Sequence, residues 1–357
     1  MDNAQGMNAK PSIAYVIDPR FSGGTSAAIA SELRVVAQFA RITIHAVSSN
    51  MFKGRNAAPA LLRAVKEIGA DLIWDAPSIG ADIVIVHNPS FLKFDSTFHT
   101  SIVAKHLIVV THENFLRPGK KESFDVLQCL SMIDQSSLAL RKSIAPISTY
   151  NRTTIKDWIE LNPQEFNWSI LDQDCFNICD FAFQKPTENP TDRRGRHSRP
   201  GMEKFPSLSD MDSCFPDHAK TNVILGGDLF IRENIRRPHW NIHPFNGLEL
   251  PEYFDQFDFM VYFTARTWHE SFGRVLAESI AAGKVVITDP STASVFGTAV
   301  VSAAPSGVDE IISHFVSHPE KYKKHVISAQ KKLSGFSSTA FEHRFLSMLE
   351  NNLGLSS

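Results

Sequence analysis

Stretches typical of buried β-strands alternate with stretches typical of helices along this chain, and the alternation limits the folds that the chain can adopt. Residues 12–18 predict a short buried strand, and a helical run from Thr25 to Ala40 follows it. Alternating strands and helices indicate an α/β fold, in which helices cover both faces of a parallel sheet. In the first half, further strands are predicted at 42–47, 82–87, 106–111 and 144–148, and further helices at 58–68 and 153–161.

The same alternation returns after a segment of different composition. Residues 181–215 are rich in Pro, Arg, Ser and Asp and lack apolar periodicity, so we place the domain junction just before or within them. At 357 residues the chain is long enough for two domains, and we predict them at 1–180 and 181–335, with a terminal helical segment at 336–357. In the second half, strands are predicted at 222–225, 241–245, 257–263, 285–288 and 299–302, and helices at 251–256, 307–317, 319–333 and 338–348.

Charge and composition narrow the range of partners. The formal net charge is −2, so the overall balance gives no indication of a nucleic-acid partner. The four cysteines have no C-x-x-C spacing and no histidine completes a ligand set, so we expect buried free thiols, a reducing compartment and no metal. The first residues lack the apolar core of a signal peptide, and no apolar run approaches the ~20 residues of a membrane span. We therefore expect a cytoplasmic protein.

Two glutamates eight positions apart, Glu270 and Glu278, lie in the most informative segment. A helical pattern ends at Gly283, so Glu278 lies about two turns into a helix and Glu270 lies in the loop before it. Backbone N–H groups of residues 272–275 lack partners within the helix and can bind an anion. A cation such as Arg274 is mildly unfavourable at this terminus, so its side chain either meets a bound anion or points outward. From the residues alone, a helix cap and a solvated acid remain the alternative for the two glutamates.

A basic cluster lies within the predicted junction. Residues 192–204 contain four arginines and Lys204 in a short segment with Gly and Pro. Guanidinium forks and ammonium groups suit a diphosphate, although a solvated basic loop or a membrane-facing patch would have the same composition.

Polar or Gly-rich residues also follow three predicted strands of the first half. Gly23-Gly24 follows the first strand, and glycine lets a backbone approach a phosphate or sugar closely, although an ordinary turn needs no more. His87 and His112 follow two later strands, and each could be a structural residue. A basic loop at 117–121 comes next and could attract an anionic acceptor or an acidic membrane surface.

The segment from Trp268 to Thr288 resembles the E-x7-E signature of retaining glycosyltransferases of the GT-B fold, most closely the family 4 type. Glu270 and Glu278 take the two glutamate positions, while Phe272-Gly273 and Ala282-Gly283 match the usual Phe-Gly and Ala-Gly. One departure is Val285, where that family usually has proline.

The resemblance implies two Rossmann-like domains that face each other across a cleft, with the last helix packed back on the N-terminal one. It implies a metal-independent enzyme of the hexosyltransferase type that moves a sugar from a nucleotide-diphosphate sugar, its co-substrate, to a hydroxyl of a glycan or lipid-linked acceptor. Synthesis of surface polysaccharide or lipopolysaccharide would be its role, with peripheral contact with the inner face of the membrane. A nucleotide-sugar epimerase and a degenerate non-catalytic subunit remain the alternatives.

The resemblance also assigns roles to individual residues. Glu278 would bind the ribose hydroxyls, and Glu270 would face the sugar. Lys204 would bind the diphosphate together with an arginine, for which Arg196 and Arg199 remain alternatives because the family's spacing is not kept. His112, which resembles the family's histidine more closely than His87 does, would approach the donor sugar. Further donor contacts would come from Phe272, Gly273, Arg274, Val275, Gly23 and Gly24.

Overall fold

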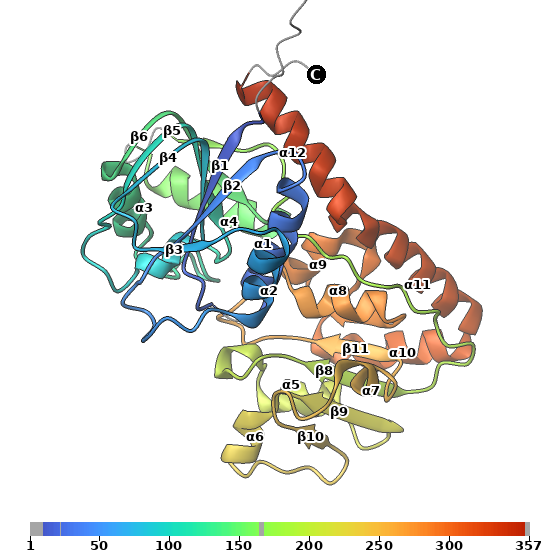
Figure 1. Ribbon diagram of the computed structural model, residues 1–357. Helices are drawn as coiled ribbons and strands as arrows, with labels where there is room; N and C mark the ends of the chain where they lie inside the picture. The colour runs from blue at the N-terminus through green and yellow to red at the C-terminus, as the bar shows by residue number, and fades with distance from the viewer. Residues whose placement is uncertain (1–9, 22, 164–167, 354–357) are drawn as a thin grey trace, which may run out of the picture. The chain divides into compact units, whose positions relative to one another are not determined.

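The computed structural model describes residues 10–21, 23–163 and 168–353. These residues form two compact units (Figure 1). The first contains the chain up to Leu116, residues 122–178 and the chain from Ser338 onward, and the second contains residues 117–121 and 179–337. Each unit has its own parallel sheet, as the alternation of strands and helices predicts.

The first unit is built on a seven-stranded parallel sheet with the order β3-β2-β1-β4-β5-β6-β7. The chain moves outward from β1 to β3 and then returns to β4 on the other side of β1, so the order reverses between β1 and β4. In open sheets of this kind, ligands bind beyond the carboxyl ends of the strands at such a reversal. The strands are β1 (Ser12–Ile17), β2 (Arg41–Ala46), β3 (Leu72–Trp74), β4 (Ser78–His87), β5 (Ser101–Thr111), β6 (Ser137–Pro146) and β7 (Ser169–Ile170).

The core of the first unit lies where the strands are covered on both faces. In β1 and in the second half of β4, nearly every residue is buried, which explains their continuous apolar runs. The first half of β5 alternates between exposed and buried residues, and that of β6 contains only exposed and half-buried residues. Their apolar pattern is therefore weaker, and the predicted strands began too late. The helices of this unit are α1 (Gly24–Val36), α2 (Pro59–Glu67), α3 (Val126–Gln135), α4 (Thr149–Leu161) and α12 (Ser338–Leu353), with a 3-10 turn at Pro89–Leu92.

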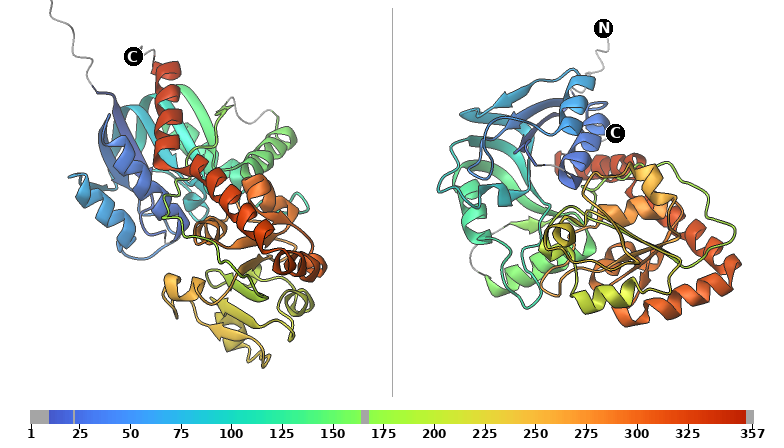
Figure 2. Two further views of the ribbon diagram at one scale, coloured as in Figure 1. Left: turned by 90° about the vertical axis from the view of Figure 1, so that its right-hand side faces the viewer. Right: turned by 90° about the horizontal axis from the view of Figure 1, so that it is seen from below.

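The last helix, α12, belongs to the first unit although it follows the second unit in sequence. It runs beside α1 (Figure 2). Phe345 of α12 packs against Phe39 and Phe176, with ring centroids 6.0 and 6.1 Å apart. Aromatic rings on this helix therefore supply the apolar face that attaches it to the unit.

The second unit is built on a six-stranded parallel sheet with the order β10-β9-β8-β11-β12-β13, and its order reverses between β8 and β11. Its strands are β8 (Arg193–His197), β9 (Thr221–Leu225), β10 (Asn241–His243), β11 (Phe259–Tyr262), β12 (Val285–Thr288) and β13 (Val301–Ser302). Its α-helices are α5 (Leu208–Cys214), α6 (Asp228–Arg232), α7 (Leu250–Phe254), α8 (Arg274–Ala281), α9 (Pro290–Phe296), α10 (Val308–Ser317) and α11 (Pro319–Leu333), and 3-10 turns lie at Met202–Lys204, Gly297–Ala299, Pro305–Gly307 and Ser334–Phe336.

Strand β8 corrects the sequence analysis, which placed a basic segment without strand character here. β8 lies in the interior of the second sheet although its sequence is Arg-Arg-Gly-Arg-His. Arg194 can be buried because it is paired: it lies 2.7 Å from Asp192 and 2.6 Å from Asp309. Arg196 is buried between the rings of Phe205 and Tyr262 and has no acidic partner within 4.0 Å among the described residues. Gly195 is required because a Cβ there would come within 2.3 Å of the Phe257 ring. A strand whose interior positions are held by arginines shows no apolar periodicity, so β8 could not be predicted from the sequence pattern.

Candidate active site

Lys204 and Glu270 form a partly buried ion pair in the second unit. Lys204 ends the 3-10 turn that follows β8, and Glu270 lies in the loop between β11 and α8. The Lys204 Nζ lies 2.6 Å from Glu270 Oε1, and the two side chains are only 8% and 14% exposed. The hydroxyl of Tyr262, the last residue of β11, donates a hydrogen bond of 2.6 Å to the same oxygen. The pair thus joins the loops that leave β8 and β11, the two strands between which the sheet order reverses.

The charge state of Glu270 follows from these neighbours. Burial alone would raise the pKa of the carboxyl, but the Lys204 ammonium, the Tyr262 hydroxyl and the positive charge of Arg199 outweigh it and lower the pKa below its ordinary value. The carboxylate is therefore ionised at neutral pH. The Tyr262 hydroxyl stays protonated, because burial and the adjacent Glu270 charge raise its pKa well above the ordinary value.

The two arginines proposed for the diphosphate have different surroundings. Arg196 of β8 is fully buried, with its guanidinium 4.5 Å from the centre of the Phe205 ring and 4.7 Å from that of Tyr262. It donates a hydrogen bond to the backbone carbonyl of Lys204. Arg199 lies after the strand, has a side chain that is 58% exposed and pairs with Glu203 at 3.2 Å. Arg196 thus holds the turn that carries Lys204, whereas the Arg199 guanidinium is open to solvent.

Helix α8 begins where the sequence places it. Gly273 is its N-cap residue and has φ +88°, a left-handed conformation that favours glycine. Phe272 is buried against Phe296 and Phe336, with ring centroids 5.2 Å away in each case. The helix ends at Ala281, just before the predicted Gly283. Phe272 therefore anchors the loop before α8. The first turn of the helix, which includes the half-buried Val275, follows directly.

Glu278 and Arg274, both on α8, form the second ion pair of the candidate site. Arg274 Nε lies 3.4 Å from Glu278 Oε1, and both side chains are about one-fifth exposed. Burial raises the pKa of Glu278, and the Arg274 charge offsets only part of that effect. The Arg274 guanidinium also lies 4.9 Å from the centre of the Phe181 ring. Arg274 therefore points along the helix toward Glu278 rather than away from the protein.

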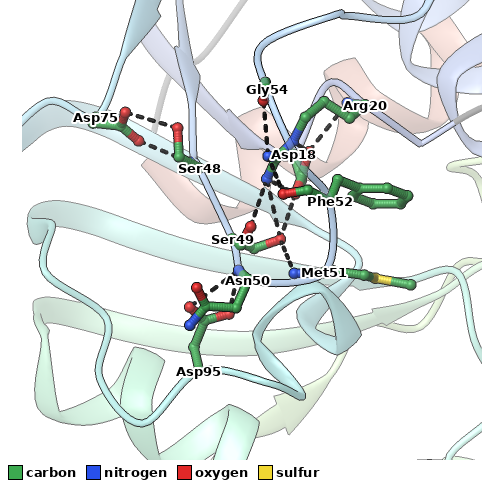
Figure 3. Close-up of polar contacts among 10 residues, drawn as sticks. All are labelled: Asp18, Arg20, Ser48, Ser49, Asn50, Met51, Phe52, Gly54, Asp75 and Asp95. Atoms are coloured by element: carbon green, nitrogen blue, oxygen red, sulfur yellow. Dashed lines mark hydrogen bonds and ion pairs between the residues drawn. The ribbon is translucent and has the colours of Figure 1, made fainter.

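Gly23 and Gly24 lie in the first unit, at the start of α1. Gly23 has φ +85°, both glycines are exposed, and a Cβ on Gly23 would contact nothing within 4 Å. Glycine is thus needed at Gly23 for its backbone conformation rather than for space. Earlier in the same loop, Asp18 and Arg20 form a buried ion pair of 2.7 Å. Figure 3 shows the Arg20 guanidinium bonded to backbone oxygens of Ser49, Phe52 and Gly54, so one side chain joins the loops that follow β1 and β2.

His112, which directly follows β5, contacts the other histidine considered for its role. Its Nε2 lies 3.0 Å from Nδ1 of His87, the last residue of β4. Burial and the neighbouring His87 lower the pKa of His112 well below its ordinary value. The two candidates are therefore neutral at physiological pH and form one hydrogen-bonded pair.

Similar solved structures extend over nearly the whole chain. HepE from Anabaena, solved with UDP and glucose, has a TM-score of 0.65 at 13% identity over 96% of this chain and 100% of its own, and it has also been solved with UDP-glucose. The pneumococcal O-GlcNAc transferase GtfA, solved with UDP and GlcNAc, has a TM-score of 0.59 at 12% identity over 96% and 99%. Sucrose-phosphate synthase from Thermosynechococcus elongatus has a TM-score of 0.61 at 10% identity over 97% and 100%.

The chain has the GT-B fold. The predicted fold class is confirmed, since each unit is a Rossmann-like sheet of parallel strands with helices.

No protein-family model matches the sequence, and a comparison with curated protein sequences also gives no match. Across the residues that the structure describes, no group of His, Cys, Asp or Glu side chains is placed to hold a metal ion. No helix in this same part of the chain is long and apolar enough to span a bilayer.

Two aromatic residues of the site in this GT-B chain, Tyr262 and Trp268, were not predicted from the sequence. Tyr262 was recognised only as part of a strand, although a hydroxyl at the carboxyl end of a central strand is a useful signal. The Trp268 ring lies under two cations, with its centre 5.1 Å from Lys204 Nζ and 5.2 Å from the guanidinium of Arg117. Arg117 belongs to the basic loop at 117–121, so this loop contributes to the second unit.

Proposed function

We propose that the protein is a retaining, metal-independent glycosyltransferase of the family 4 type that uses a nucleotide-diphosphate sugar. The observation that most supports this proposal is the Lys204–Glu270 pair, which joins the two loops at the order reversal of the second sheet. An ammonium group beside an ionised carboxylate, both partly removed from water, suits a substrate with an anionic leaving group and a sugar that develops positive charge.

In the proposed reaction, Lys204 and the exposed Arg199 bind the diphosphate. Backbone N–H groups from Phe272 to Val275 at the start of α8 add further donors. Glu278 accepts hydrogen bonds from the ribose hydroxyls, and Arg274 orients it. Arg196 acts indirectly, because it holds the carbonyl of Lys204 and so positions the turn.

The bond between the anomeric carbon and the β-phosphate oxygen breaks, and a bond from the acceptor hydroxyl forms on the same face of the sugar. The acceptor proton passes to the departing phosphate oxygen, so no base from the protein is needed. Glu270, held ionised by Lys204, stabilises positive charge at the anomeric carbon. Gly23, Gly24 and His112 approach the donor sugar from the first unit. We propose a hydroxyl of a glycan or lipid-linked molecule as the acceptor, in surface polysaccharide or lipopolysaccharide synthesis.

The basic loop at 117–121 supports a proposed peripheral contact with the inner face of the cytoplasmic membrane.

The similar structures solved with UDP make a UDP-sugar the first donor to test. The purified protein is heated with UDP, GDP or ADP, and the matching nucleotide is expected to raise the melting temperature. Glu278→Ala should abolish the shift, whereas Glu252→Ala, on the exposed side of α7, should keep it. No shift with any of the three nucleotides would refute the donor site.

A second assay separates binding from catalysis. Glu270→Ala is expected to reduce donor turnover much more than nucleotide affinity, because the carboxylate faces the sugar rather than the nucleotide. An equal loss of both would reassign Glu270 to plain binding. Conversion of the nucleotide sugar to an isomer without any acceptor would instead favour the epimerase, and the absence of any transfer or donor hydrolysis would favour a non-catalytic subunit.

A further inference from the structure

Three titratable side chains, from α1, from β4 and from the residue after β5, lie in a row within the first unit. Glu32 of α1 is fully buried, and its Oε2 lies 3.2 Å from Nε2 of His87, which is 1% exposed. His87 Nδ1 in turn lies 3.0 Å from His112 Nε2. The row therefore leads from the core of the unit, through the end of β4, to the residue that follows β5.

The surroundings of this row are apolar or weakly polar. The Tyr15 ring stacks on His87 with centroids 5.7 Å apart, and the Phe176 ring lies edge-on at 6.1 Å. Tyr15 and Cys175 are the other titratable groups close enough to interact with the charge of Glu32. In the described part of the chain, His87 is the one basic side chain within 4.0 Å of the Glu32 carboxyl, and no lysine or arginine lies that close.

Burial in such surroundings decides the protonation states. It raises the pKa of the Glu32 carboxyl well above its ordinary value and lowers the pKa of His87 to about 3. Both groups are therefore neutral at physiological pH. Both Glu32 oxygens and His87 Nε2 are without a hydrogen-bond partner of good geometry among the described residues. Rotation of the carboxyl group can therefore align its proton with His87 Nε2, which lies 3.2 Å away.

A neutral row has two conceivable hydrogen-bond arrangements, because a carboxylic acid has both an O–H donor and a carbonyl acceptor. The arrangement in which the acid donates is favoured, since in the reverse one the buried Glu32 O–H has no acceptor among the described residues. In the favoured arrangement the acid donates to Nε2 of His87, so the His87 proton must be on Nδ1. That N–H then donates to Nε2 of His112, so the His112 proton must also be on Nδ1. An ionised Glu32 would accept from His87 instead and would reverse every bond in the row. One buried carboxyl proton thus determines whether the remaining nitrogen of His112 is a donor or an acceptor.

We infer that Glu32 is a positioning residue which, through His87, fixes the proton of His112 on Nδ1 and so makes His112 a hydrogen-bond donor. The ligand that accepts this bond presents an oxygen, and if the proposed function is correct it is a hydroxyl of the donor sugar. His112 is then not a general base. The tautomer itself does not depend on any ligand or on catalysis.

The test is a measurement of histidine tautomers by long-range ¹H–¹⁵N NMR on ligand-free protein labelled with ¹⁵N-histidine, at pH 7. Wild type is expected to show His87 and His112 as Nδ1–H tautomers. Glu32→Gln should leave both unchanged, because its amide N–H donates to His87 Nε2 as the acid does. Glu32→Leu removes the donor and should produce a mixture of tautomers at His112. His112→Asn assigns the His112 signal, and His106, whose Nε2 contacts Ser143, is the internal control.

Each result has a defined meaning. An Nε2–H tautomer or a mixture for His112 in wild type overturns the inference, and so does a change of tautomer in Glu32→Gln. An unchanged His112 in Glu32→Leu shows that Glu32 does not determine the proton and also overturns it. If Glu32→Leu fails to fold, the wild-type and Glu32→Gln spectra still decide. The proposed function can fail without altering these spectra, because no nucleotide sugar is present.

Discussion

Lys204→Met and Glu270→Gln, made separately and together, measure how strongly the central ion pair of the second unit is coupled. At a separation of 2.6 Å and an effective dielectric constant of about 20, two unit charges attract by about 6 kcal/mol. Loss of hydration offsets part of this attraction, because the two side chains are only 8% and 14% exposed. Removal of Lys204 alone leaves a largely buried carboxylate without its cation, which should cost about 3–5 kcal/mol.

The double variant should cost much less than the sum of the two single variants, with a coupling energy of about 2–3 kcal/mol. The assay is urea denaturation of all four proteins at pH 7, with unfolding monitored by tryptophan fluorescence. The exposed pair of Arg34 and Glu67, which are also 2.6 Å apart, is the matched control, and the corresponding Met and Gln variants should couple much more weakly. If the Lys204 and Glu270 variants are additive to within about 0.5 kcal/mol, the pair is not coupled and the argument for an ionised Glu270 fails.

The same variants have a pH dependence with a definite sign. Without Lys204, the dominant effect on Glu270 is burial, which raises the pKa of its carboxyl in the folded protein above the pKa of the same carboxyl in the unfolded chain. The folded state then binds more protons than the unfolded state, so Lys204→Met should lose stability as the pH rises from 5 to 8. The double variant has no carboxyl at position 270 and should lack this loss.

Three further predictions concern the framework around the site. Burial lowers the pKa of His106 from 6.5 to about 4, so at acidic pH the folded state binds fewer protons than the unfolded state. Between pH 7 and pH 5, wild type should therefore lose about 2 kcal/mol more stability than His106→Gln, as measured by urea denaturation. Gly195→Ala forces a Cβ within 2.3 Å of Phe257 and should lower stability by about 1–3 kcal/mol in the same assay, whereas an unchanged midpoint would contradict the placement of β8. Arg20→Met leaves the Asp18 carboxylate buried without its partner, which should cost about 3–5 kcal/mol of stability. It should also increase hydrogen exchange in the loops after β1 and β2, and unchanged exchange there would show that Arg20 does not hold these loops.

The parts of the fold predicted correctly from sequence are those stabilised by apolar burial. Buried strands such as β1 and β12 have continuous apolar runs, and α8 shows its start at Gly273 and its end near Gly283. The local pattern of residues was sufficient there, because burial on both faces leaves little choice of side chain. The α/β fold class follows from these elements, whereas the GT-B architecture was implied by the resemblance of the segment around Glu270 and Glu278.

The sequence was misleading where interior contacts are polar. β8 was missed because Arg194 and Arg196 take positions usually held by apolar residues, and because Asp309, one of the two partners of Arg194, is 115 residues away in the sequence. The row from Glu32 to His112 was missed for a related reason. Glu32 looks like a surface acid within a helix, and only the packing of α1 on the sheet shows that it is fully buried. A polar side chain in the core is recognised by its partners, which the sequence alone does not reveal.

Isothermal titration calorimetry with UDP tests the central claim most directly, namely that Lys204 and the start of α8 bind the diphosphate of a nucleotide sugar. Wild type and Glu252→Ala are predicted to bind one UDP per chain. Lys204→Met and Glu278→Ala are each predicted to lose most of this affinity, because one removes the diphosphate cation and the other the ribose acceptor. UDP binding of equal strength in all four proteins, or the absence of binding to wild type by UDP, GDP and ADP at millimolar concentration, would contradict the account.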